Sequence, residues 1–442
     1  MNPVDSASDT LSAEEIRELH AEYLFPCVNT YYEEPLPLVS GNGMYVTDPD
    51  GDEYLDFFAG ILTVSVGHCN PEVTAAVVGQ AETLQHVSTL YPMQPQVEYA
   101  RKLAGLTPGA LKKCFFTNSG SEANETAVLL ARLATGRDEI ITLRHAYSGR
   151  TEVAMNLTAQ AVWRRAGSTM AFVKHAHNAY CYRCSFGLSY PACDLRCARD
   201  LEELIQTTTS GEPAAFMAEP IQGIGGFVTP PKEYFEIVVG IIRKYGGLFI
   251  CDEVQTGFGR TGGKMFGIEH WGVEPDIMTM AKGIANGLPM GATIATPEVA
   301  DVFTGLSIST FGGNPISCRA ALATADYIEE HALAENARMQ GDRLWEALKV
   351  LQEKYPAIGD VRGMGLMQAL EIVDPASDDG KAPDTELTNR VFEETKRRRV
   401  LIGRGGMYGN VFRIAPPMIV TADEVDAAVR ALDESFAAAL RF

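Results

Sequence analysis

Between about residues 110 and 300 the sequence alternates short apolar runs with amphipathic stretches. The runs have the length of strands and read CFFTN, EIITLRHAY, MAFVKHA, AAFMAEP, GLFICDE, DIMTMAKG and MGATIAT. Strands that are apolar throughout must be covered on both faces, as in a mainly parallel sheet between helices. The sequence therefore predicts an α/β fold with a mainly parallel seven-stranded sheet, in a large domain over residues 71–314.

The chain becomes helix-rich from about residue 315, with short strand candidates at GLMQALEIV and VFRIAPPMIV. This pattern predicts a smaller α+β domain over residues 315–442. In the segment GMYVTDPDGDEYLDFFAG, the turn DPDGDE predicts a hairpin, and residues 1–70 are expected to pack with the small domain. Ser12 with Glu15 predicts a capping box that opens a short helix, so residues 1 to about 10 are expected to fray.

Composition limits the partners that the protein can have. Of the 442 residues, 46% are hydrophobic and 21% are charged, which predicts a large core, and no run reaches the length of a membrane span. A formal net charge of −20 argues against nucleic acid and anionic membranes as partners, because those surfaces repel an acidic protein. The first twenty residues lack both an apolar export signal and an Arg-rich presequence, which predicts a cytoplasmic protein whose partners are small molecules.

Two residues at the ends of apolar runs have the chemistry of a cofactor site. Lys282 and Asp252 each close such a run with a Gly-rich turn behind, and ligands of open α/β sheets bind beyond the carboxyl ends of the strands. A lysine in that position can form a Schiff base, and a carboxylate there can pair with a pyridinium nitrogen. Taken alone, such a lysine is more often a surface side chain with a buried stem.

Other residues behind the apolar runs add to this site. Ser119, Gly120 and Ser121 lead into a helix whose free N–H groups suit a phosphate, although a plain N-cap has the same pattern. Tyr147 would place a flat aromatic ring at the ligand crevice. The alternative is that its ring only packs against other side chains. Glu219 is a charge at the tip of an apolar strand and requires a cation nearby.

Four of the nine cysteines, Cys181, Cys184, Cys193 and Cys197, have the spacing C-x2-C-x8-C-x3-C. Four thiols so close in sequence are a known pattern for structural zinc. The intervening segment is short and rich in Tyr and Pro, so reduced loop cysteines are the preferred interpretation, and we assign no metal site.

These motifs together resemble one family. NSGSEANETA, DEVQTGFGRTG, MAKGIANGLPMGA, TFGGNP, VRGMGLM and FRIAPP stand in the order and spacing of the class III, or ω-, aminotransferases, which are fold-type I enzymes dependent on pyridoxal 5′-phosphate (PLP). Within that family FAGILTVSVGHCNP, AEPIQGIGGFVTPP and GRGGMYGNVFRIAPPM are most similar to the branch of mitochondrial-type alanine–glyoxylate aminotransferases. The family often has His after the stacking Tyr, where this chain has Ser148.

The resemblance implies a role for each residue of the cofactor site. Lys282 would hold PLP covalently and then move the proton between carbons, and Asp252 would keep the pyridine nitrogen protonated. The ring would lie between Tyr147 and Val254, with Gln255 bonded to its phenolic oxygen. The phosphate would be held by Ser119, Gly120 and Ser121 and by Thr310 of a neighbouring subunit, so the resemblance implies a homodimer or a dimer of dimers.

The resemblance also implies substrate contacts. Arg413 would fork onto the carboxylate of a 2-oxo acid, and Glu219 would neutralise Arg413 when the substrate has no carboxylate there. A fixed bridge between Arg413 and Glu219 is the alternative. Ile61 would line the substrate pocket.

The predicted activity is transfer of an amino group from an amino acid, a β- or ω-amino acid or an amine to a small 2-oxo acid such as pyruvate or glyoxylate. There are two alternatives. One is a racemase or epimerase that uses the same lysine and aspartate, and the other is a non-catalytic protein with the same fold.

Overall fold

The computed structural model describes residues 11–165 and 170–441. Its centre is a seven-stranded sheet in the order β4-β10-β9-β8-β7-β5-β6. Only β10 runs antiparallel to its neighbours, so the mainly parallel sheet is confirmed. Each of the seven predicted runs overlaps one strand: β4 (Lys113–Thr117), β5 (Ile140–Leu143), β6 (Val173–Ala176), β7 (Ala215–Ala218), β8 (Leu248–Asp252), β9 (Ile277–Met280) and β10 (Gly291–Ala295).

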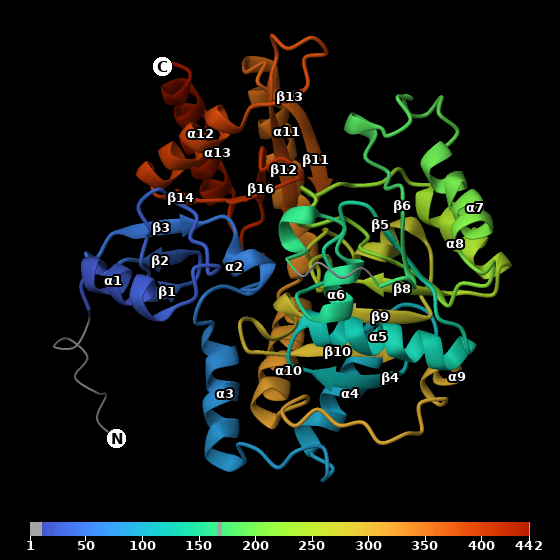
Figure 1. Ribbon diagram of the computed structural model, residues 1–442. Coiled ribbons are helices and arrows are strands. Elements are labelled where there is room, and N and C mark those ends of the chain that lie inside the picture. The colour runs from blue at the N-terminus through green and yellow to red at the C-terminus, as the bar shows by residue number, and fades with distance from the viewer. Residues whose placement is uncertain (1–10, 166–169, 442) are drawn as a thin grey trace.

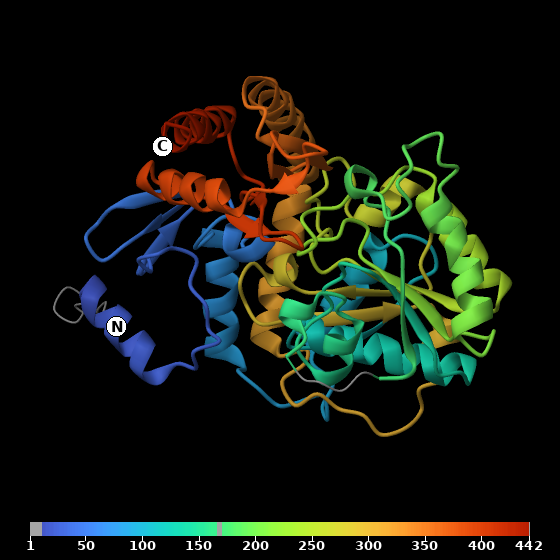
Figure 2. The same ribbon diagram turned by 45° about the horizontal axis from the view of Figure 1, so that its top comes forward.

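Both faces of the central strands are buried, which explains why a strand such as β7 is apolar throughout. Successive side chains of a strand point to opposite faces, so in β7 Ala215 and Met217 join one hydrophobic core while Phe216 and Ala218 join the other. Helices lie on both faces of the sheet and contribute buried side chains to both cores (Figures 1 and 2). They are α4 (Gln94–Leu106), α5 (Gly120–Thr135), α6 (Glu152–Leu157), α7 (Arg196–Thr208), α8 (Tyr234–Lys244) and α9 (Pro297–Ala300). The loops also contain the short turns η1 (Ala161–Trp163), η2 (Cys181–Arg183), η3 (Gly267–Trp271) and η4 (Lys282–Ala285).

A second sheet forms in the C-terminal part, in the order β11-β12-β16-β15, with β13 paired to β12. Helices α11, α12 and α13 pack on one another and on this sheet, and they lie together at the top of Figure 1. The elements are α11 (Leu333–Lys354), β11 (Ile358–Met364), β12 (Met367–Asp374), β13 (Ala382–Pro383), α12 (Thr385–Arg397), β14 (Val400–Leu401), β15 (Gly403–Gly405), β16 (Val411–Ile414) and α13 (Ala422–Ala439).

The N-terminal strands complete a third sheet with a strand from the other end of the chain. The predicted hairpin is confirmed, because β2 (Tyr45–Thr47) and β3 (Glu53–Asp56) pair antiparallel, next to β1 (Ser40–Asn42). β3 also pairs in parallel with β14, with Leu55 opposite Val400. Beyond β3, α2 (Ala59–Leu62) is followed by α3 (Pro71–Thr83), and α10 (Pro315–Glu330) packs on α3 and α4. The domain boundaries at residues 70 and 314 stay predictions.

The first described helix, α1 (Ala13–Tyr23), starts at the predicted capping box. Glu15 donates its backbone N–H to Ser12 Oγ, and the Glu15 carboxylate accepts the Ser12 N–H. The prediction that residues 1 to about 10 fray lies outside the described residues. In the described part of the chain, no helix combines the length and the apolar character needed to cross a bilayer.

Candidate active site

Strand register brings the predicted acids and the lysine to one edge of the central sheet. Ala218 of β7 pairs with Cys251 of β8, so the residues that follow them, Glu219 and Asp252, lie side by side. Asp252 in turn pairs with Thr279 of β9, and Lys282 follows three residues later. Parallel strands end at the same edge, which is why residues 219, 252 and 282 meet although the sequence separates them.

Asp252 is buried and both of its carboxylate oxygens are held in place. Oδ1 accepts the Val254 N–H at 3.0 Å, and Oδ2 accepts Asn124 Nδ2 at 2.9 Å. Burial raises the pKa of Asp252, whereas these two hydrogen bonds and Lys282 lower it. The Asn124 amide also donates to the Ser148 carbonyl at 2.8 Å, and its two neighbours are both acceptors, so its orientation is unambiguous. Asp252 is thus a fixed acceptor, and each of its oxygens keeps a lone pair for a further donor.

Lys282 begins the single turn η4 with a left-handed backbone, φ 47°. Burial lowers the pKa of Lys282, while Asp252 and Glu219 oppose that shift. A lysine whose pKa falls has a larger share of the neutral amine, which is the nucleophile. The position of Lys282 therefore suits covalent attachment of a carbonyl group better than it suits a surface charge.

The start of α5 forms a close-fitting cradle next to Asp252. Ser119 is the N-cap and accepts the Glu122 N–H at 3.3 Å, so the N-cap interpretation is also correct. At Gly120 a Cβ would lie 3.1 Å from Val254 Cγ2, and at Gly149 it would lie 2.2 Å from Ser121 Oγ. At Gly149, which also has φ 132°, only glycine permits the approach, and at Gly120 a side chain would require Val254 to shift by a few tenths of an ångström. These approaches bring the predicted phosphate residues against Val254 and the Tyr147 loop.

Tyr147 and Gln255 face the same region. Glu219 accepts the Tyr147 N–H at 3.2 Å and the Gly223 N–H at 2.8 Å, so it fixes the loop that carries the ring. Gln255 is buried, and its Oε1 has no hydrogen-bond partner among the described residues. A buried amide oxygen left without a partner is costly, which indicates that a further polar group belongs beside it.

Arg413, on β16, is 1% exposed and has no carboxylate partner in the described chain. Its Nε donates to the Arg404 carbonyl at 3.3 Å, and its guanidinium lies 4.8 Å from the Phe58 ring centroid and 5.7 Å from that of Phe227. Nη1 is buried without a partner among the described residues. Burial lowers the pKa of Arg413, opposed by Tyr31 and Glu219. The structure thus shows no fixed bridge to Glu219 within residues 11–165 and 170–441.

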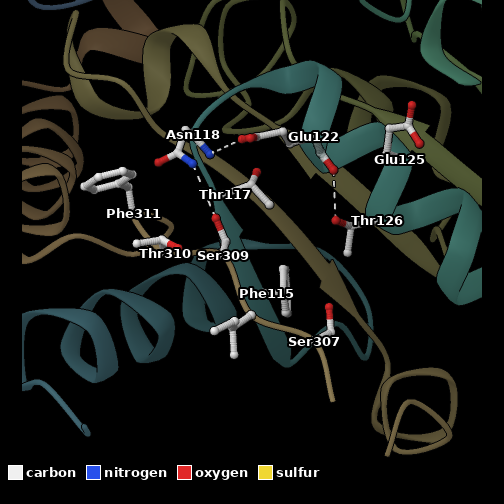
Figure 3. Close-up of a pocket in the computed structure, with 11 residues that line it drawn as sticks. Phe115, Thr117, Asn118, Glu122, Glu125, Thr126, Ser307, Ser309, Thr310 and Phe311 are labelled. Atoms are coloured by element: carbon white, nitrogen blue, oxygen red, sulfur yellow. Dashed lines mark hydrogen bonds between the residues drawn. The ribbon is translucent and has the colours of Figure 1, made fainter. Parts of the chain in front are cut away.

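Two predicted residues are not enclosed with the others. Ile61 is 45% exposed and belongs to a left-handed turn, with φ 67°. Left-handed non-glycine residues cost about 1–2 kcal/mol each, and Asp56 Oδ1 stabilises this turn by accepting the Phe58 and Ala59 N–H groups. Thr310 is exposed and lines an open pocket with Asn118, whose side chain donates to Ser309 Oγ at 3.3 Å (Figure 3).

The four clustered cysteines are free thiols around η2 and the start of α7. Burial and the neighbouring thiols raise the pKa of Cys197 to about 12. Across the described ranges, no group of three or more His, Cys, Asp or Glu side chains is arranged to hold a metal ion.

Sequence reasoning missed Asn124, Tyr31 and the two rings beside Arg413. Asn124 could have been found, because it lies one helical turn after Gly120 and faces the same way. Tyr31, Phe58 and Phe227 come from distant segments, and no local pattern connects them to Arg413.

The residues at the sheet edge fit PLP: an acceptor for a pyridinium at Asp252, an amine of lowered pKa at Lys282, and a close-fitting helix N-terminus. This arrangement on a mainly parallel sheet defines a fold-type I, PLP-dependent enzyme. The aminotransferase class-III family profile matches residues 28–436, and the chain belongs to that family.

Known proteins agree with this assignment. The chain is 44% identical over 96% of its length to alanine–glyoxylate aminotransferase 2 homolog 2, mitochondrial, of Arabidopsis thaliana, and covers 87% of it. It is 39% identical to the human alanine–glyoxylate aminotransferase 2, mitochondrial, over 95% of this chain and 85% of the relative. A PLP-bound amine transaminase from an uncultivated Pseudomonas species matches with a TM-score of 0.88 at 32% identity, over 94% of this chain and 98% of that one.

The protein is therefore a PLP-dependent aminotransferase, and these similarities give no support to the racemase, epimerase or non-catalytic alternatives. The predicted cytoplasmic location is corrected, because the Arabidopsis and human relatives are both named mitochondrial. That prediction relied on the composition of the first twenty residues alone.

Proposed function

We propose that each residue at the sheet edge has a separate role in transamination. PLP supplies an electron sink for the carbanion of the amino donor. Lys282 Nζ would hold the cofactor covalently and would move the proton between the two carbons of the reaction. Asp252 would keep the pyridine nitrogen protonated, and Asn124 keeps Asp252 in position. Ser119, Gly120 and Ser121 would hold the phosphate, Gln255 would bond the phenolic oxygen, and Tyr147 and Val254 would flank the ring.

The environment of Arg413 is the observation from which we infer the substrate class. A guanidinium that is 1% exposed, without a carboxylate partner in the described residues, is a costly arrangement unless a ligand completes it. A carboxylate takes two parallel hydrogen bonds from a guanidinium. The acceptor is therefore a small 2-oxo acid, of which pyruvate and glyoxylate are the first to test, and the relatives named alanine–glyoxylate aminotransferases support this choice. Ile61 is proposed as a side wall of the same substrate pocket.

Glu219 is proposed to serve Arg413 when the substrate has no carboxylate. In the structure its two oxygens accept the Tyr147 and Gly223 N–H groups, and its charge partly opposes the lowering of the pKa of Arg413 that burial causes. Burial raises the pKa of Glu219 itself. Rotation toward Arg413 would exchange two backbone hydrogen bonds for one ion pair, so one pocket could accept a carboxylate-free amine as donor.

Replacement of Arg413 by lysine tests the proposed function. Arg413→Lys keeps a positive charge but loses the second parallel bond, so we expect KM for pyruvate or glyoxylate to rise about 10- to 100-fold. Single-turnover reaction with a carboxylate-free amine, if that amine is accepted, should change much less.

Arg399→Lys is the matched control for this variant. Arg399 pairs with Asp52 at the surface, outside the site. An equal loss in both half-reactions, together with a lower Tm, would mean that Arg413 holds the fold and does not bind the acceptor.

We also propose that the active enzyme is a homodimer, or a dimer of dimers, in which Thr310 binds the phosphate of the neighbouring subunit. The loop that carries Thr310 exposes Leu306, Ile308 and Phe311, and an exposed apolar group of this kind marks a contact surface. Dilution below the dimer dissociation constant should then release PLP. Sedimentation with absorbance at the cofactor band measures both quantities together, and monomers that keep PLP as tightly as dimers would contradict the shared site.

A further inference from the structure

Tyr31 lies next to Arg413, on the segment between α1 and β1. Its hydroxyl donates to the Arg404 carbonyl at 3.5 Å, and Arg413 Nε donates to the same carbonyl at 3.3 Å. Two donors that share one acceptor must be neighbours. The Tyr31 ring also lies 6.0 Å from the Phe58 ring, which covers the Arg413 guanidinium. Tyr31 is 40% exposed, whereas the neighbouring Arg413 is 1% exposed.

The ring of Tyr31 is well fixed because its segment is attached to α12. Tyr31 packs edge-on against Phe392 at 5.3 Å, and Tyr32 stacks on the same ring at 4.9 Å. The Glu33 N–H donates to Glu393 Oε1 at 2.8 Å. These contacts join Tyr31, which precedes all strands of the central sheet in the sequence, to α12, which follows all of them.

The hydroxyl of Tyr31 donates one long hydrogen bond among the described residues, and its oxygen also acts on the Arg413 guanidinium, where it opposes the lowering of the pKa of Arg413. Its 3.5 Å bond to Arg404 is long compared with the usual 2.7–2.8 Å of an O–H···O hydrogen bond. A fixed ring with a weakly bonded hydroxyl can redirect that hydroxyl at little cost when a better acceptor arrives. A carboxylate on Arg413 is such an acceptor, and it would still have lone pairs free after the guanidinium has bound.

We propose that Tyr31 is a specificity-determining residue that donates a further hydrogen bond to the carboxylate bound by Arg413. It favours substrates with a carboxylate at that position over carboxylate-free amines. This inference rests on the proposed function, because it requires Arg413 to bind the substrate carboxylate.

Tyr31→Phe removes the hydroxyl and keeps the ring contacts with Phe58 and Phe392. We expect KM for pyruvate or glyoxylate to rise about tenfold, because a hydrogen bond to a charged group is lost and this one is partly exposed to water. The maximal rate kcat and the single-turnover rate with a carboxylate-free amine should stay at the parent values. Tyr32→Phe is the matched control, because Tyr32 stacks on Phe392 but has no contact with Arg404 or Arg413 among the described hydrogen bonds.

A double-mutant cycle separates this inference from the proposed function. If Tyr31 and Arg413 bind the same carboxylate, Tyr31→Phe should raise KM by a much smaller factor in the Arg413→Lys background than in the parent enzyme. A selective effect of Arg413→Lys combined with an unchanged KM in Tyr31→Phe would overturn the role of Tyr31 alone. An Arg413→Lys variant without a selective effect would overturn the proposed function instead. Equal losses in both half-reactions of Tyr31→Phe would make Tyr31 a structural residue.

Discussion

Lys282→Ala should still bind PLP through its phosphate and ring contacts but lose turnover by about 10⁴-fold or more. The side chain has two proposed tasks, covalent attachment and proton transfer, and general acid–base catalysis alone contributes about 10²–10⁴-fold. The lowered pKa of Lys282, caused first by burial, supplies the neutral amine for both tasks. Among the groups that influence this pKa, Asp252 and Glu219 are acids and Arg413 is always charged, so no second amine replaces it there.

Borohydride reduction followed by peptide mapping measures the attachment directly. In the parent the label should fall on the peptide that contains Lys282, and the variant should carry none. Lys264→Ala is the control, because Lys264 is exposed on a Gly-rich turn of similar composition and should leave labelling and turnover unchanged. A label on any other lysine of the parent would refute the assignment.

Asp252→Asn should retain the cofactor but slow proton abstraction from the amino donor by about 10²- to 10³-fold. A neutral amide cannot hold the positive charge of the pyridinium, and removal of one fixed electrostatic partner of a reacting group typically costs that much. Asparagine keeps the shape, and one of its atoms can still accept the Val254 N–H, so the fold should not change.

Rapid mixing of the PLP form with an amino donor gives the rate of this half-reaction. Asp276→Asn is a matched control, since the Asp276 carboxylate accepts the Phe249 N–H at 2.8 Å but lies at the start of β9, at the opposite end from Lys282. Equal half-reaction rates in Asp252→Asn and the parent would show that the proposed role is wrong.

The sequence identified the central sheet because the burial of both faces leaves a direct record in the chain. Every residue of a strand such as β7 must be apolar when helices cover both faces, and this holds whatever the order of the strands. Residues just behind those strands are necessarily at an edge of the sheet. Lys282, Asp252 and Glu219 could therefore be proposed as one site from the sequence alone, and their chemistry indicated the cofactor.

Only the tertiary structure decided which of these residues touch and what completes the site. The order β4-β10-β9-β8-β7-β5-β6 sets Glu219 beside Asp252, and strand order leaves no local pattern in a sequence. The surroundings of Arg413 come from Tyr31, Phe58 and Phe227, which lie between 186 and 382 residues before it in the sequence. Strand and cap signals depend on neighbours in the chain, so they could be predicted from the sequence. The packing of distant segments depends on the shape of the whole fold, so it had to be observed in the structure.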